Sequence, residues 1–209
     1  CQNSYHQAEG YFRQQKFDNA KPLFQEYLKE YPSHQKTREY LGDIAGYAKE
    51  WDTAIAYYED LLADDANSAT YNYKYGGALG MKALEVNRFV AITYIGDIKS
   101  AFENAARLDS NHIDVRWALV EFYMRLPGVI GGSEFKAIKY ADELGRISPV
   151  DGYLAKGFIA EYGNHFKEAE RFYKKAIEVG GSWHSYKKLL NLYEKNNEIE
   201  KAREVSAKL

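Results

Sequence analysis

Five histidines and one cysteine are the residues of this chain best suited to hold a metal ion or to attack a substrate. The histidines are spread along the sequence, and no two of them share one face of a helix: His6, His34, His112, His165 and His184. Metal sites need ligands at short spacings, such as His-x-x-x-His or two pairs of cysteines. Neither pattern occurs here, so we predict no metal ion and no cofactor.

The carboxylates are numerous but lie among lysines on what we expect to be the outer faces of helices. Asp60, Asp64 and Asp65 are typical, and a solvated face accounts for them. No serine lies in the strand–turn–helix setting of a hydrolase nucleophile. We therefore predict that the chain is not an enzyme.

A short glycine-rich segment, Leu-Pro-Gly-Val-Ile-Gly-Gly-Ser over residues 126–133, is the stretch most similar to a phosphate-binding loop. It lacks the Gly-Lys-Ser/Thr that such a loop needs, and no strand precedes it. We expect Ser133 to cap the next helix, with Glu134 at the positive end of that helix. Nucleotide binding is not predicted.

Charge and hydropathy argue against two further classes of protein. The chain has 28 Lys and Arg against 30 Asp and Glu, which gives no net positive field for holding nucleic acid. The longest apolar runs, over residues 89–95 and 117–124, are far shorter than the roughly 20 residues of a membrane-spanning helix. We predict neither nucleic acid binding nor a membrane span.

The sequence begins with Cys1, and two interpretations are open. In the first, a secretory signal has been removed and Cys1 is the lipid attachment residue of an exported bacterial lipoprotein, which is periplasmic or membrane-anchored. In the second, residue 1 is an arbitrary boundary and the protein is cytoplasmic. Residues upstream of Cys1 would decide between them.

An amphipathic helical pattern recurs along the chain. A small or aliphatic residue is followed four positions later by an aromatic residue, and three positions after that by another apolar residue. The four clearest copies open at Ala20, Ala54, Ile98 and Ala169, and looser copies open at Ala137 and Ala202. Each follows another predicted helix, over residues 5–14, 37–49, 69–85, 113–125, 150–162 and 183–195.

This pattern resembles the tetratricopeptide repeat, a helix–turn–helix unit of 34 residues. The first unit carries the family's residues at Ala8, Tyr11, Ala20, Phe24 and Pro32. The resemblance implies an all-α, right-handed solenoid of six hairpins in a single domain over residues 1–209. The expected repeats are 1–34, 35–68, 69–112, 113–149, 150–182 and 183–209.

Two adjacent units are longer than the family length. The third has extra residues around 81–96, and the fourth contains the Pro-Gly/Gly-Gly segment at 126–133. Both insertions fall between the two helices of a hairpin, so we expect them to lie together at one edge of the solenoid. This predicted insertion edge is apolar and consists of Phe89, Ile92, Tyr94, Ile95, Leu126, Val129 and Ile130. The two segments either cover each other or leave a patch that docks a partner or a second copy.

In a tetratricopeptide solenoid the first helix of each hairpin lines the concave surface. The resemblance therefore implies a partner-binding groove rich in aromatic residues, with charges of both signs. Its predicted members are Tyr5, His6, Phe12, Arg13, Tyr40, Tyr47, Tyr73, Lys74, Trp117, Met124, Arg125, Phe158 and Tyr162. Tyr, Trp, Met and Arg are the residue types enriched where proteins bind proteins.

The sequence thus predicts a non-catalytic scaffold or adaptor that binds a peptide or protein segment in this groove, as a subunit of a cell-envelope complex if Cys1 marks export. The alternative is a structural protein that forms homo-oligomers through the insertion edge.

Overall fold

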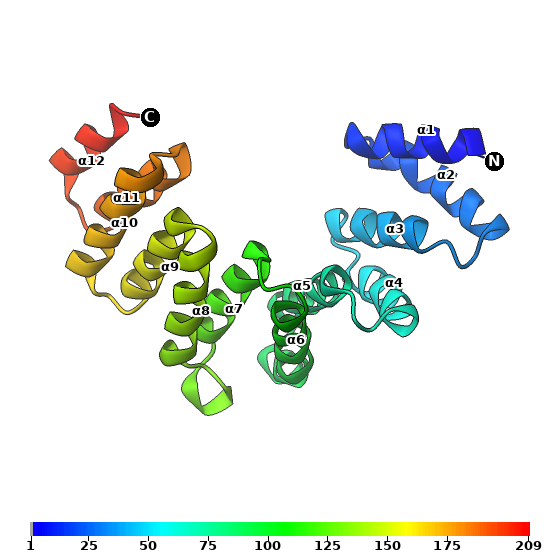
Figure 1. Cartoon of the computed structure of the whole chain (residues 1–209), viewed down its shortest axis with the longest axis horizontal. Coiled ribbons are helices and arrows are strands. Elements are labelled where there is room, and N and C mark those ends of the chain that lie inside the picture. The colour runs from blue at the N-terminus through cyan, green and yellow to red at the C-terminus, as the bar shows by residue number, and fades with distance from the viewer. Residues whose placement is uncertain (1) are drawn as a thin grey trace. The chain divides into compact units, whose positions relative to one another are not determined.

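A computed structural model describes residues 2–209, so Cys1 and its predicted lipid attachment lie outside the described residues. The described chain is built of helices and has no strand. The first helices of the six hairpins are α1 (Gln2–Arg13), α3 (Gln35–Tyr47), α5 (Ala69–Glu85), α7 (Ile113–Arg125), α9 (Pro149–Tyr162) and α11 (Trp183–Lys195). The second helices are α2 (Phe17–Glu30), α4 (Trp51–Asp64), α6 (Arg88–Leu108), α8 (Glu134–Ile147), α10 (Phe166–Gly180) and α12 (Ile199–Ser206). The predicted all-α class of stacked hairpins is confirmed (Figure 1).

The chain divides into two compact units, the first ending at Ser110 and the second running from Asn111 to Leu209. Helices α1 to α6 belong to the first unit, and α7 to α12 belong to the second. The single domain over residues 1–209 stays a prediction.

Small residues in the first helices allow the aromatic residue of the second helix to pack closely. A Cβ atom placed on Gly42 would lie 2.8 Å from Cε1 of Tyr58, and one placed on Gly157 would lie 2.3 Å from Cε1 of Tyr173. Tyr173 is fully buried. The repeated Gly–aromatic spacing of the sequence is therefore a packing contact between the two helices of one hairpin.

In the second to sixth hairpins, the first helix is capped at its N-terminus by a side chain. His34 and His112 accept the backbone N–H three residues ahead through Nδ1, from Thr37 at 3.2 Å and from Val115 at 3.4 Å. Serine does the same for α5, α9 and α11. The two histidines are thus capping groups.

Four of the six hairpins share one turn, in which a residue adopts a left-handed backbone. These residues are Gln15, Lys49, Asn164 and Asn197, with φ between 58° and 60°. The third and fourth hairpins, which carry the insertions, turn differently.

In the third hairpin the extra residues extend the helices and do not form a separate loop. Helix α5 continues to Glu85 and α6 begins at Arg88, so only Val86 and Asn87 lie between them. The Asn87 side chain accepts the backbone N–H groups of Phe89 and Val90 at 3.1 and 3.2 Å. The sequence between 81 and 96 contains no proline and the cap is strong, which explains why both helices lengthen.

In the fourth hairpin the insertion forms a compact turn around a 3₁₀ helix, Gly128–Ile130. Gly131 has φ +109°, and a Cβ on Gly132 would lie 1.8 Å from the carbonyl oxygen of Leu126, so glycine is required at both positions. Ser133 then caps α8 by accepting the N–H of Lys136 at 3.3 Å, as the sequence predicted. Among residues 2–209, no helix is long and apolar enough to cross a bilayer.

Candidate functional site

The predicted groove residues lie on the first helices of the hairpins, and we call the face that carries them the inner face. In the first unit this face is formed by α1, α3 and α5, and in the second by α7, α9 and α11. The two inner faces differ in how their side chains are used.

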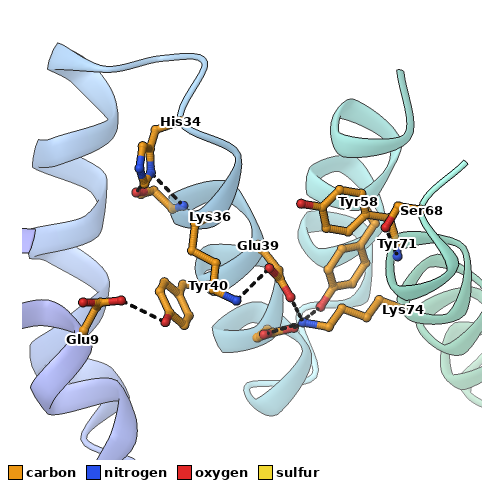
Figure 2. A network of polar contacts seen from close by, with 11 residues as sticks. Glu9, His34, Lys36, Glu39, Tyr40, Tyr58, Ser68, Tyr71 and Lys74 are labelled. Atoms are coloured by element: carbon orange, nitrogen blue, oxygen red, sulfur yellow. Dashed lines mark hydrogen bonds and ion pairs between the residues drawn. The ribbon is translucent and has the colours of Figure 1, made fainter. Parts of the chain in front are cut away.

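Lys74 is the centre of a polar network on the inner face of the first unit (Figure 2). Its Nζ lies 2.6 Å from Oε1 of Glu39 and 2.7 Å from both carboxylate oxygens of Asp43, which are on the neighbouring helix α3. Lys36 donates to the second oxygen of Glu39 at 2.9 Å. Glu39 is only 7% exposed. These contacts bind α5 to α3 through charge-assisted hydrogen bonds.

Tyrosine hydroxyls extend the network to α1 and α4. Tyr40 donates to Glu9 of α1 at 3.1 Å, and Tyr58 of α4 donates to Asp43 at 2.8 Å. Burial and the neighbouring Asp43 carboxylate raise the pKa of Tyr58 far above its ordinary value, so this hydroxyl stays protonated and donating. The network therefore cross-links all three first helices of the unit.

The pKa of Glu39 reflects its two lysine partners. Burial raises this pKa, but hydrogen bonds from Lys74 and Lys36 and their positive charges lower it by more, and the net pKa lies below the ordinary glutamate value. Glu39 is therefore an ionised, paired group, which suits a structural contact between helices better than proton transfer.

Most of the predicted groove aromatics of the first unit are half-buried against neighbouring rings. Tyr5 lies 4.8 Å from Tyr27, Phe12 lies 4.6 Å from Tyr40, and Tyr73 lies 6.2 Å from Phe102, measured between ring centres. These side chains hold the hairpins together. Three predicted residues of this unit are exposed to solvent: His6, Arg13 and Tyr47.

The second unit contains two corresponding contacts between first helices, and one of them joins Lys195 of α11 to Glu161 of α9 at 3.3 Å, with the Lys195 side chain 62% exposed. Trp117 of α7 is half-buried, and its indole Nε1 donates to Oδ1 of Asp151 on α9 at 2.8 Å. Met124 is also half-buried. Trp117 therefore links two first helices and contributes to the core.

The remaining predicted residues of the second unit form a row of a cation and two aromatic rings, in which Phe158 is half-buried and the other two residues are exposed. The Arg125 guanidinium lies 6.0 Å from the ring centre of Phe158, and that ring lies 6.0 Å from the ring of Tyr162. The Arg125 side chain is 59% exposed and Tyr162 is 47% exposed. Arg125 also pairs with Glu121 at 3.1 Å, a surface pair of low energy.

One exposed aromatic residue on a first helix was not among the predicted groove residues. Trp183 begins α11, is 58% exposed, and lies under the Lys187 ammonium at 4.6 Å.

The pairing between neighbouring first helices was also missed. Lys74 and Glu39 are 35 residues apart, Trp117 and Asp151 are 34 apart, and Tyr40 and Glu9 are 31 apart. These separations are close to one repeat length, so complementary side chains one repeat apart were the signal that could have identified the contacts.

The predicted insertion edge is divided between the two units. Phe89 and Ile92 are exposed, and Tyr94 and Ile95 are half-buried in the first unit. Leu126 and Ile130 are half-buried in the second unit, whereas Val129 is 95% exposed. The joining of the two segments into one edge stays a prediction. In the described part of the chain, no three His, Cys, Asp or Glu side chains lie close enough to hold a metal ion.

Comparisons with known proteins agree on the fold. The sequence model of the tetratricopeptide repeat matches residues 2–34. No curated protein matches the chain. Several solved structures do, at identities that show the fold alone.

A thermophilic tetratricopeptide-repeat protein of Thermus thermophilus is 17% identical, with a TM-score of 0.68 over 93% of this chain and 95% of its own. PilW, a widely conserved type IV pilus biogenesis factor, is 16% identical, with a TM-score of 0.72 over 100% and 91%. YrrB, described as a repeat protein with an unusual peptide-binding site, is 18% identical, with a TM-score of 0.54 over 88% and 89%.

Proposed function

Because this chain folds as a tetratricopeptide-repeat solenoid, we propose that it is a non-catalytic scaffold that binds a segment of another protein on the inner face of its second unit. The fold supports protein–protein interaction in general. YrrB, a protein of similar fold, is described as having a peptide-binding site.

The observation that carries the proposal is the row formed by Arg125, Phe158 and Tyr162. Arginine and tyrosine are enriched at the energetically dominant positions of protein interfaces. Two adjacent rings provide apolar area at a low cost in conformational entropy, because each has only two rotatable side-chain bonds. A guanidinium beside them adds a fixed positive charge.

The chemistry of the row indicates the kind of segment it accepts. An apolar or aromatic side chain of the partner would pack on Phe158 and Tyr162. A carboxylate beside it would receive hydrogen bonds from Arg125, whose present partner Glu121 is held only at the surface. We therefore propose a segment that pairs an apolar anchor with an acidic residue.

The inner face of the first unit has a smaller role in this proposal. Lys74, Glu39 and Asp43 satisfy one another there, so a partner would have to replace existing charge-assisted bonds.

Peptide selection tests the proposal even while the natural partner is unidentified. A random peptide library is displayed on phage and selected against the full chain, and selected peptides are then measured by calorimetry. We expect an enrichment of acidic and apolar residues, and a loss of affinity of at least about tenfold in the Phe158→Ala, Tyr162→Ala double variant.

Val179→Ser is the matched control, because Val179 is 52% exposed on the second helix α10, away from the inner face. This variant should bind as the parent chain does. Peptides that bind the double variant and the parent chain equally well would contradict the proposal.

A place in a cell-envelope assembly is a finer part of the proposal, supported by the similarity of fold to PilW, which is described as a pilus biogenesis factor. Fractionation of native cells tests it with an antibody to this chain. Recovery with the envelope is expected, and recovery only with cytoplasmic proteins would contradict it.

A further inference from the structure

The end of the third hairpin carries a concentration of exposed apolar side chains. We call these five residues the hairpin tip: Met81, Leu84, Phe89, Val90 and Ile92, which are 43%, 76%, 71%, 38% and 47% exposed. All five lie within five residues of the Val86–Asn87 turn, which is about 8 Å along either helix. They therefore lie close together at one end of the third hairpin, within the first unit.

The patch is exposed because α5 and α6 pack through their other faces. Gly76 and Leu79 of α5 and Ile98, Ala101 and Phe102 of α6 are buried. A Cβ on Gly76 would lie 2.9 Å from the Phe102 ring, so this contact fixes how the two helices are rotated. The lengthened ends of the two helices carry apolar residues that take no part in this contact between α5 and α6.

We propose that the hairpin tip is the contact surface between two copies of this chain, which associate about a two-fold axis. The five side chains expose roughly 500 Å² of apolar surface, since one large apolar side chain carries about 150–250 Å². Two such tips would bury about 1,000 Å², which is the lower limit for a specific interface. Because this area lies at the lower limit, we expect a weak dimer, with a dissociation constant on the order of 10–100 µM.

The charges beside the patch favour a second copy over an anionic bilayer. Glu85 ends α5 and Arg88 begins α6, so one acid and one base flank the turn. Lys82, the other cation nearby, is paired with Asp52. An anionic membrane surface would select an excess of cations, whereas a neutral patch with one charge of each sign is complementary to itself.

The two-fold arrangement predicts which of these charges face each other. In an isologous contact each copy presents the same patch to the other. With the axis near the Val86–Asn87 turn, Glu85 of one copy faces Arg88 of the second copy, and the reverse pair forms on the other side.

Sedimentation equilibrium of the full chain tests the tip. Between about 1 and 300 µM, the average mass should rise from that of a monomer toward that of a dimer. Phe89→Glu should raise the dissociation constant at least tenfold. Val179→Glu is the matched control, since Val179 is 52% exposed on α10 and belongs to neither insertion, and it should leave association unchanged.

A chain that remains a monomer throughout this range, or a Phe89→Glu variant that associates as the control does, would overturn the proposal. Binding of a monomeric chain to phosphatidylglycerol vesicles, lost in Phe89→Glu, would also overturn it by identifying a bilayer as the occupant.

Charge reversal tests the arrangement. Glu85→Arg and Arg88→Glu should each weaken self-association several-fold, because like charges then face each other. An equimolar mixture of the two variants should restore association, with one copy of each variant in the dimer. Dimers of unchanged strength in both single variants, or a mixture that fails to restore association, would exclude the two-fold contact at the turn.

Discussion

The two units use equivalent positions of the same repeat in different ways. In the first, the inner face is cross-linked by Lys74 with Glu39 and Asp43, and by Tyr40 with Glu9. In the second, Trp117 with Asp151 and the more exposed pair of Lys195 with Glu161 provide such links, while Arg125 and Tyr162 remain accessible. Inner-face side chains that bind neighbouring helices add cohesion, and those without such a partner are available to another molecule.

The two units also differ in their balance of acidic and basic residues. Residues 1–110 contain 16 Asp and Glu against 12 Lys and Arg, whereas residues 111–209 contain 14 against 16. The acidic excess of the first unit includes Glu9, Glu39 and Asp43, which accept the internal bonds. The basic excess of the second includes Arg125, the proposed contact for an acidic residue of the bound segment.

Removal of the central cation of the first unit should give the largest effect. Lys74→Met leaves Glu39 and Asp43 facing each other in a mostly buried site, because both lose their bond to the ammonium. We expect the free energy of unfolding to fall by about 2–3 kcal/mol. Urea unfolding followed by circular dichroism measures the change.

Two further cations serve as controls for Lys74. Lys82→Met removes a pair to Asp52, which is 83% exposed, and Arg125→Met removes an exposed cation on the inner face of the second unit. Each should change the free energy of unfolding by less than about 0.5–1 kcal/mol. If Lys74→Met and Arg125→Met had equal effects, the contrast between the two inner faces would be lost.

Two glycine substitutions should have effects of opposite sign. Gly157→Ala in the second unit forces the new Cβ into the buried Tyr173 ring and should cost about 1–3 kcal/mol. Gly77→Ala on α5 of the first unit meets no atom within 4 Å and should stabilise the chain by up to about 1 kcal/mol, through higher helix propensity. Thermal unfolding of both variants checks the signs, and destabilisation by Gly77→Ala would show that α5 is packed at that point.

Acid should weaken the network of the first unit. The pKa of Glu39 is lower in the folded chain than in the unfolded one, where it is about 4.3. Its stabilising contribution is therefore complete above the unfolded pKa and is lost as pH falls through the folded pKa. Glu39→Gln should show a smaller loss of stability from pH 5 downward in urea unfolding at a series of pH values, and an unchanged slope would exclude Glu39 from the acid response.

The repeat architecture could be predicted from the sequence because its signals are local. Helices α5, α7 and α11 begin and end at the predicted residues, since Ser68, His112 and Ser182 cap them and amphipathic spacing continues to their ends. Gly42 and Gly157 marked the close contacts within hairpins. The longer helices of the third hairpin were harder to foresee, because a run without proline between two helices has no local sign of where its turn falls.

The candidate site could be predicted only in part. The sequence placed Tyr40, Lys74 and Trp117 on the first helices of their hairpins, and there they lie, but their partners come from a neighbouring repeat. Helix periodicity shows which face of a helix a residue occupies. It does not show whether that residue already forms a hydrogen bond or ion pair with a side chain one repeat away. The exposed Tyr162 and Arg125 could be distinguished from Lys74, which is paired within the chain, only once those long-range contacts were known.

A matched pair of tyrosines tests most directly the claim that the second inner face binds a partner while the first holds its hairpins together. Tyr47 is the last residue of α3 and Tyr162 the last of α9, and both are exposed. Calorimetric titration with a library-selected peptide should show that Tyr162→Ala weakens binding about tenfold or more, whereas Tyr47→Ala changes it less than about twofold. A larger loss for Tyr47→Ala than for Tyr162→Ala would contradict the account.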